Sequence, residues 1–316
     1  MTLAARLDAR AGRAYFAVQA AAGALWWVAV ALDPGIRTLT LGDLPAGPVA
    51  IADVPLFVFA SVLAAIGIRF AAPVVTGWTM LVAVMMAGYA TITGLAGWGA
   101  LLMIAAMIGS LGATLLVQLN RIPSEWLLIG PFRAREAESA PARVHLLRTG
   151  AQIVIFWGTC LVVVPAVIAI VEWRWGLRVA LPVAVPALGG VLLAAASALG
   201  VWSAVTMAGR GDGTPLPIAT ARRLIVSGPY RFVRNPMAVA GITQGVAVGM
   251  LCGSWLVVVY TLCGSLVWND LIRPWEERDL VDRFGAPYEA YRDRVSCWIP
   301  RRPRRASGTA RRPLVY

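Results

Sequence analysis

Long apolar stretches separated by short polar segments dominate the chain. A membrane-spanning helix needs about 20 mostly apolar residues, and eight stretches approach this length, at approximately residues 14–32, 49–68, 74–92, 100–117, 153–171, 179–207, 237–251 and 255–272. The sixth contains two prolines, and the seventh is short enough to be re-entrant instead of spanning. The pattern predicts an all-α, polytopic membrane protein with about eight transmembrane helices, the last two forming a C-terminal helical hairpin with cytoplasmic loops beside it.

The composition favours a lipid bilayer over a large soluble core. The 316 residues are 59% hydrophobic and only 14% charged, whereas soluble domains carry about 25% charged residues. The net charge is +12, and in a membrane protein such an excess indicates cytoplasmic loops and anionic lipid, so no nucleic-acid partner is expected. The four cysteines and the one histidine, His145, form no recognisable metal-ligand pattern, so no metal is expected.

The distribution of arginines predicts the orientation. With the N-terminus inside, the outside loops hold only Arg37, Arg174 and Arg178. This places both termini in the cytoplasm. Because the basic residues are all arginine and Ala, Val and Gly are abundant, we expect a bacterial inner membrane. The first helix is expected to be retained, since no small-residue cleavage site follows it.

Three regions are expected along the chain. Residues 1–130 form a four-helix membrane region of unknown role, and a polar, proline-containing loop separates it from a second region, residues 131–300. Residues 301–316 form a basic tail, expected to be disordered and close to the membrane. Asp53, near the start of the second apolar stretch, is expected to reach the interface.

Polar residues cluster before the seventh stretch, in the sequence G-P-Y-R-F-V-R-N-P-M from Gly228. Asn235 is a natural N-cap, and Pro236 fits a first helical turn. One interpretation is a cap and a loop with two arginines that extend to the headgroups. The other is an anion site made by the helix N-terminus with Arg231 and Arg234, suited to a carboxylate or a phosphate.

Two glycines, Gly241 and Gly245, follow on the predicted seventh helix. They favour either close helix packing or a bare face against which a ligand can lie.

A second polar cluster follows the last stretch, in R-P-W-E-E from Arg273. Pro274 should end or kink the helix. The cluster is either an ion-paired juxtamembrane helix or a lid in which one glutamate, Glu276 or Glu277, points back to the arginines. Adjacent glutamates diverge on a helix, so at most one does so. Gly285 should stop this helix, and the aromatic residues after it are typical of an interfacial anchor.

The ordered combination of these motifs resembles the isoprenylcysteine carboxyl methyltransferase and phospholipid methyltransferase superfamily. G-P-Y-R-F-V-R-N-P-M, an apolar hairpin, and E-E-R-D-L-V-D-R-F-G-A-P-Y-E-A-Y-R-D-R-V-S-C-W-I-P carry the resemblance, over about residues 213–301. It implies an integral membrane methyltransferase that binds S-adenosyl-L-methionine at the cytoplasmic ends of its last helices.

Site residues carried over from this resemblance fall into two groups. Arg234 and Glu277 would be catalytic, and the cofactor would be bound by Gly228, Pro229, Tyr230, Arg231, Asn235, Pro236, Gly241 and Glu276. The chain departs from the family at Asn235, where a histidine is usual, and at Ala238, where a tyrosine is usual.

The expected acceptor is lipid-like or a small hydrophobic molecule. A carboxylate of the isoprenylcysteine type is favoured, because it needs no general base and this region has no histidine; for an amine or a thiol, Glu276 or Glu277 would have to supply the base. Alternatives are a phospholipid amine, a small thiol, a sterol-type reduction with NADPH, and a scaffold without activity. G-P-Y-R with R-N-P-M favours the methyltransferase over the reductase.

Overall fold

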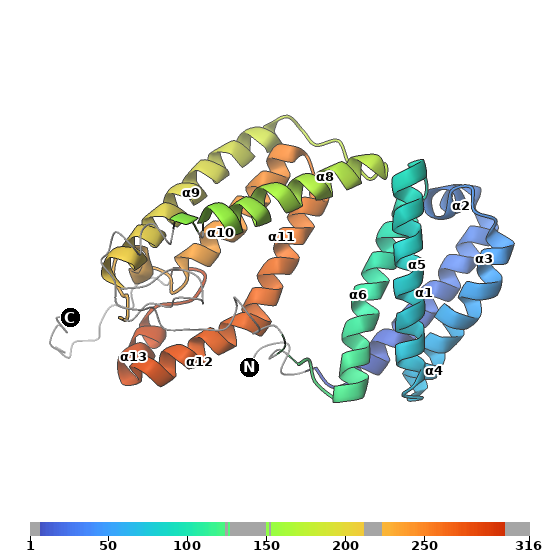
Figure 1. The fold of residues 1–316 in the computed structure, drawn as a ribbon, viewed down its shortest axis with the longest axis horizontal. Coiled ribbons are helices and arrows are strands. Elements are labelled where there is room, and N and C mark those ends of the chain that lie inside the picture. The colour runs from blue at the N-terminus through green and yellow to red at the C-terminus, as the bar shows by residue number, and fades with distance from the viewer. Residues whose placement is uncertain (1–6, 124–125, 127–149, 152, 212–222, 301–316) are drawn as a thin grey trace.

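The computed structural model describes residues 7–123, 126, 150–151, 153–211 and 223–300. Within these residues the chain is helical and has no strand, which confirms the all-α prediction (Figure 1). Among the described residues, seven helices are long and apolar enough to cross a membrane, so the protein is a multi-pass membrane protein. The boundary predicted near residue 131, His145 and the tail 301–316 lie outside the described residues.

The first half of the chain is a bundle with long helices side by side (Figure 1). Its helices are α1 (Ala9–Leu32), α2 (Pro34–Leu41), α3 (Ala46–Asp53), α4 (Ala60–Ile66), α5 (Ala71–Thr93) and α6 (Gly97–Leu119). A π-helical segment, Val54–Phe59, joins α3 to α4 and contains Pro55. Because proline lacks an N–H, the local π geometry lets one helix continue through it.

Small side chains and paired polar groups fill the interior of this bundle. Gly12 of α1 lies so close to α6 that a Cβ would be 2.7 Å from the Ala113 carbonyl oxygen. The buried Gln19 amide donates to Ser61 Oγ at 3.1 Å and accepts from Ser110 Oγ at 2.8 Å. Close approach and interhelical hydrogen bonds are the usual means by which helices associate in lipid.

Asp53 is buried, with 6% of its surface exposed. The prediction that it reaches the interface was therefore wrong. The indole N–H groups of Trp27 and Trp78 donate to its two oxygens at 2.9 and 2.8 Å. These two tryptophans lie on α1 and α5, so only the tertiary packing reveals that the carboxylate has partners inside the bundle.

The second half contains the remaining described helices. Its helices are α8 (Val164–Arg174), α9 (Ala184–Arg210), α10 (Pro236–Cys252), α11 (Trp255–Val267), α12 (Arg273–Phe284) and α13 (Ala286–Arg294). Two π-helical segments, Ile153–Trp157 and Thr159–Val163, precede α8. The predicted sixth stretch begins later than expected, because Pro182 precedes α9 and Pro186 lies in its first turn.

Helices α10 and α11 form the predicted hairpin. Gly253 has φ +62° and ends α10, and Ser254 caps α11 by accepting from the Val257 N–H at 3.2 Å. Ser254 also donates its hydroxyl to the buried Glu172 of α8. At 17 residues, α10 is shorter than each of the seven continuous helical runs that could cross a membrane. This agrees with the short seventh stretch.

The two halves contact each other at one end of the molecule. Arg174 of α8 donates to the Thr91 and Ile92 carbonyls that end α5, at 2.8 and 2.5 Å. Trp98 stacks on Trp255 with ring centroids 6.1 Å apart. Helices α12 and α13 lie at the other end, the end at which α1 begins (Figure 1).

Candidate functional site

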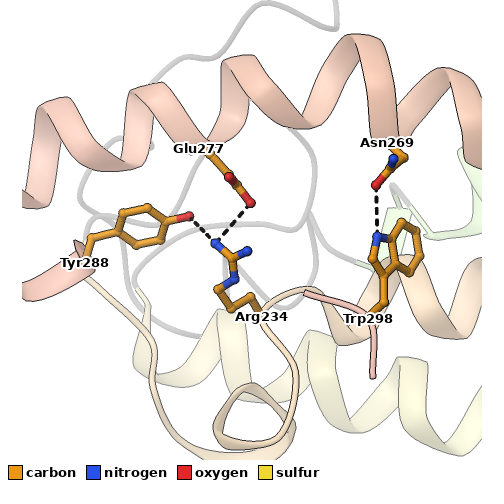
Figure 2. Close-up of polar contacts among 5 residues, drawn as sticks. All are labelled: Arg234, Asn269, Glu277, Tyr288 and Trp298. Atoms are coloured by element: carbon orange, nitrogen blue, oxygen red, sulfur yellow. Dashed lines mark hydrogen bonds and ion pairs between the residues drawn. The ribbon is translucent and has the colours of Figure 1, made fainter. Parts of the chain in front are cut away.

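The 3₁₀ helix η8 (Gly228–Arg231), the start of α10, and helices α12 and α13 bring polar side chains together at this end. Arg234 Nη1 lies 3.0 Å from Glu277 Oε1, and the two side chains are 14% and 26% exposed (Figure 2). One glutamate was predicted to point back to an arginine, and Glu277 does so. Burial strengthens this ion pair relative to a fully exposed one.

Further contacts fix Arg234 in place. Its backbone N–H donates to the Ser296 carbonyl at 2.9 Å, and Nη1 donates to the Tyr288 hydroxyl at 3.4 Å. Its Nε is buried and has no hydrogen-bond partner among the described residues. A buried donor without a partner is costly in a folded protein, so this N–H is available to an anionic ligand.

Helix α12 reaches the site because the helical run bends without ending at Pro274. A π-helical segment, Trp268–Ile272, joins α11 to α12, and α12 runs across the end of α11 (Figure 1). Pro274 was predicted to end or kink the helix, and the chain bends here. Gly285, with φ +54°, ends α12 as predicted and lets α13 turn back towards η8.

Helix α13 attaches the site loop through two tyrosines. The Tyr291 hydroxyl donates to the Tyr230 carbonyl at 2.6 Å, and both Tyr288 and Tyr291 are at most 5% exposed. Burial raises the pKa of Tyr291, so its hydroxyl stays protonated and donates. The sequence indicated an interfacial anchor here, but these two tyrosines pack onto the site. Their i,i+3 spacing after Gly285 is the signal that could have identified them.

Trp298 makes a second attachment. Its indole N–H donates to Asn269 Oδ1 at 2.9 Å (Figure 2). Residues after α13 are thereby tied to the π-helical segment before α12. Both attachments hold the polar end of the molecule together.

The residues of G-P-Y-R have different surroundings. Gly228 has φ +59°, which glycine adopts readily. Pro229 and Tyr230 are buried, and the Tyr230 hydroxyl lies 4.0 Å from Met207 sulfur on α9. Arg231 is exposed and lies over the Phe232 ring at 4.5 Å, and no contact links it to Arg234. The segment therefore packs η8 on α9 and leaves Arg231 at the surface.

The start of α10 forms as predicted. Asn235 Oδ1 accepts from the Ala238 N–H at 2.9 Å, which makes Asn235 the N-cap. Pro236 is buried in the first turn. Asn235 thus uses its side-chain oxygen for the cap and keeps its amide N–H groups as possible donors.

The structure separates the two glycines that the sequence left equivalent. A Cβ on Gly245 would be 2.5 Å from Thr261 Oγ1 of α11, so this glycine permits close helix packing. A Cβ on Gly241 would meet nothing within 4 Å. Gly241 therefore presents a bare face with room beside it.

Arg273 and Glu276 complete the charged group. Arg273 lies near Glu277 and the buried Cys297, and its Nε is also buried without a partner among the described residues. Glu276 is directed instead towards Trp268. The prediction that the adjacent glutamates diverge is confirmed, and Glu277 lies within reach of both Arg234 and Arg273.

These residues fit the chemistry of S-adenosyl-L-methionine. Its carboxylate can accept from the unpaired guanidinium N–H groups of Arg234 and Arg273. Its ammonium and sulfonium groups are positive and suit the carboxylates of α12, and Gly241 leaves space for an extended ligand. No group of three or more His, Cys, Asp or Glu that could hold a metal occurs in the part of the chain that the structure describes.

Comparison with known protein families identifies a match for the region that contains this site. Residues 185–286 match the family model described as phospholipid methyltransferase. The matched region begins in α9 and ends at the start of α13, and it contains all ten predicted site residues. No curated protein and no solved structure matches the chain. The region 185–286 therefore belongs to the phospholipid methyltransferase family, and the chain is a membrane methyltransferase that uses S-adenosyl-L-methionine.

Proposed function

We propose that the protein transfers the methyl group of S-adenosyl-L-methionine to the carboxylate of a lipid-like or small hydrophobic acceptor, of the isoprenylcysteine type. The observation that carries this proposal is the buried guanidinium of Arg234, which is paired with Glu277 but has an unpaired Nε. Such a group binds and orients a carboxylate. Arg234 binds either the acceptor or the carboxylate of the cofactor, and Arg273 is suited to the other.

The side chains of the site have simple roles in this reaction. Glu277 holds Arg234 in place and supplies negative charge near the positive cofactor. Gly228, Pro229, Tyr230, Asn235, Pro236, Gly241 and Glu276 form the wall of the cofactor site, and Arg231 lies at its rim. The cofactor supplies an electrophilic methyl group when bound. Methyl transfer then depends on alignment and on exclusion of water, to which the buried Tyr288 and Tyr291 of α13 contribute.

A carboxylate acceptor agrees with the proton chemistry of the site. A carboxylate attacks without losing a proton, whereas a protonated amine or a thiol needs a base. No histidine lies among residues 223–300, Glu277 is already engaged by Arg234, and Glu276 is directed towards Trp268. Ala238, which replaces the family's usual tyrosine, leaves additional room for the acceptor.

The membrane arrangement proposed from the arginines suits this reaction. The site lies at the end of the helices at which α1 begins, and we place that end in the cytoplasm of a bacterial inner membrane. The polar cofactor then arrives from the cytoplasm, while the acceptor keeps its apolar part in the bilayer.

Radiolabelled methyl transfer into a total lipid extract tests the acceptor class. A carboxyl methyl ester releases labelled methanol in mild base, whereas N-methyl and S-methyl products retain the label. Release of the label supports the proposal, and a base-stable labelled product contradicts it. Calorimetric titration with S-adenosylhomocysteine and with NADPH separates the methyltransferase from a reductase, because only the first should bind.

A further inference from the structure

A cavity of about 320 Å³ lies inside the N-terminal bundle, outside the matched methyltransferase region. Helices α1, α2, α3, α5 and α6 and the π-helical segment all contribute to its wall, which is mostly apolar. A cavity of about 150 Å³ is enough to bind benzene, so this space can hold a ligand roughly twice that size. This volume suits one short hydrocarbon chain better than a folded partner segment.

Asp53 is the acidic residue in this wall. It is 6% exposed, and each of its oxygens accepts one indole N–H, from Trp27 and from Trp78. No arginine in the described part of the chain pairs with it. A carboxylate inside a spanning helix is costly and usually has a function. Two neutral donors supply hydrogen bonds but no positive charge, so the site is incomplete for a charged carboxylate.

Aromatic side chains surround the same space. Tyr15, Trp26 and Phe57 line the cavity with Asp53. The faces of aromatic rings attract ammonium groups, especially where water is excluded. A carboxylate among aromatic rings, next to an apolar space, is a chemical match for a cationic head attached to a hydrocarbon chain.

We propose that this cavity binds a single-chain amphiphile with an ammonium head. The head pairs with Asp53, and the chain fills the apolar part of the cavity. This site is separate from the methyltransferase site, and its occupation is measured without cofactor or methyl transfer.

The position of the lining residues gives such a ligand access from the bilayer. Val18 of α1 and Leu102 of α6 line the cavity but are 68% and 53% exposed. The cavity therefore reaches the surface of the bundle where these two helices meet. A hydrocarbon chain can pass through this opening without leaving the membrane.

The test uses the purified full-length protein and native mass spectrometry with two probes of equal chain length. These are dodecyltrimethylammonium, which is cationic, and dodecyl sulfate, which is anionic. Ala106 of α6 is half-buried and lines the cavity, so Ala106→Leu fills it. Ala105, its neighbour on the same helix, is exposed and does not line the cavity, so Ala105→Leu is the matched control. Asp53→Asn removes the charge.

We expect the wild type to bind one dodecyltrimethylammonium ion at least about tenfold more tightly than dodecyl sulfate. Ala106→Leu should weaken binding of the cation by about tenfold or more, and Ala105→Leu should leave it unchanged. Asp53→Asn should abolish the preference for the cation. Equal affinity of the wild type for both probes, or unchanged binding by Ala106→Leu, would overturn the proposal. Because these two results do not involve Asp53→Asn, the test decides even if that variant fails to fold.

Discussion

The N-terminal bundle and the C-terminal half use buried polar groups in opposite ways. In the bundle, Gln19 shares its amide between Ser61 and Ser110, and each group has a partner. In the C-terminal half, the Nε atoms of Arg234 and Arg273 are buried without one. A satisfied network stabilises helix association, whereas an unsatisfied donor indicates where a ligand completes the structure. The difference predicts that substitutions in the two halves affect different measurements.

Replacing Arg234 tests this contrast most strongly. Arg234→Ala leaves the half-buried Glu277 without its partner and removes a charged donor aimed at the ligand; loss of one such positioned donor lowers a rate by about 10²–10³-fold. We expect methyl transfer to fall by that factor while membrane insertion is retained, measured with radiolabelled cofactor. The control is Arg292→Ala, because the ion pair of Arg292, with Glu289 at 3.8 Å, is exposed. Full activity of Arg234→Ala would remove the site assignment.

Glu277→Gln separates charge from shape at the same place. The amide can still contact Arg234 but carries no charge, so we expect methyl transfer to fall by about 10–100-fold. Asp279→Asn is the matched control on α12, since Asp279 pairs with Arg283 at 2.9 Å away from Arg234. Equal losses in both variants would mean that the effect comes from the stability of α12.

Local sequence signals predicted much of the C-terminal half. Proline and glycine determine backbone geometry directly, so the Asn235 cap and the Gly285 stop were predicted from a few neighbouring residues. The approach of a glutamate to Arg234 was expected as well. The choice of Glu277 over Glu276 was not, because it depends on how α12 is rotated after the π-helical segment, which has no clear local signal.

Contacts between distant residues account for what the sequence did not predict. Asp53 meets Trp27 and Trp78 only when α1, α3 and α5 pack together, so its burial was missed. The same holds for the bond from Tyr291 to Tyr230, which are 61 residues apart. The difference between Gly241 and Gly245 also depends on where α11 lies.

The two glycines of α10 allow a ligand-binding role and a packing role to be compared within one helix. Gly241→Leu fills open space, so we expect a stable protein whose affinity for S-adenosylhomocysteine falls about tenfold or more in calorimetry. To compare the effect on stability, each glycine is replaced by alanine and the melting temperature is measured. Gly245→Ala should lower the melting temperature, because its Cβ meets Thr261 at 2.5 Å, and Gly241→Ala should not. Unchanged affinity in a folded Gly241→Leu variant would place the cofactor elsewhere.

Tyr291→Phe tests whether α13 holds the site loop. It removes a buried hydrogen bond of 2.6 Å to the Tyr230 carbonyl, so we expect a loss of about 0.5–1.5 kcal/mol in the free energy of unfolding, or more if the carbonyl stays unpaired. Methyl transfer should fall moderately, since Arg234 follows η8 closely. Tyr288→Phe should have a smaller effect on stability, because its bond to Arg234 is 3.4 Å long.

Thr76→Val has the smallest expected effect and tests whether the polar groups of the bundle contribute to stability and not to methyl transfer. Thr76 Oγ1 lies 2.7 Å from Thr114 Oγ1 and 3.2 Å from the Ser110 carbonyl, and it is 5% exposed. Interhelical hydrogen bonds in membranes contribute about 0.6 kcal/mol on average, so unfolding in denaturing detergent should become easier by about that amount. Methyl transfer at saturating cofactor should not change, because Thr76 lies in the bundle, outside the matched methyltransferase region. A loss of activity with the fold intact would mean that the bundle contributes to the reaction, and the functional division between the two halves would be wrong.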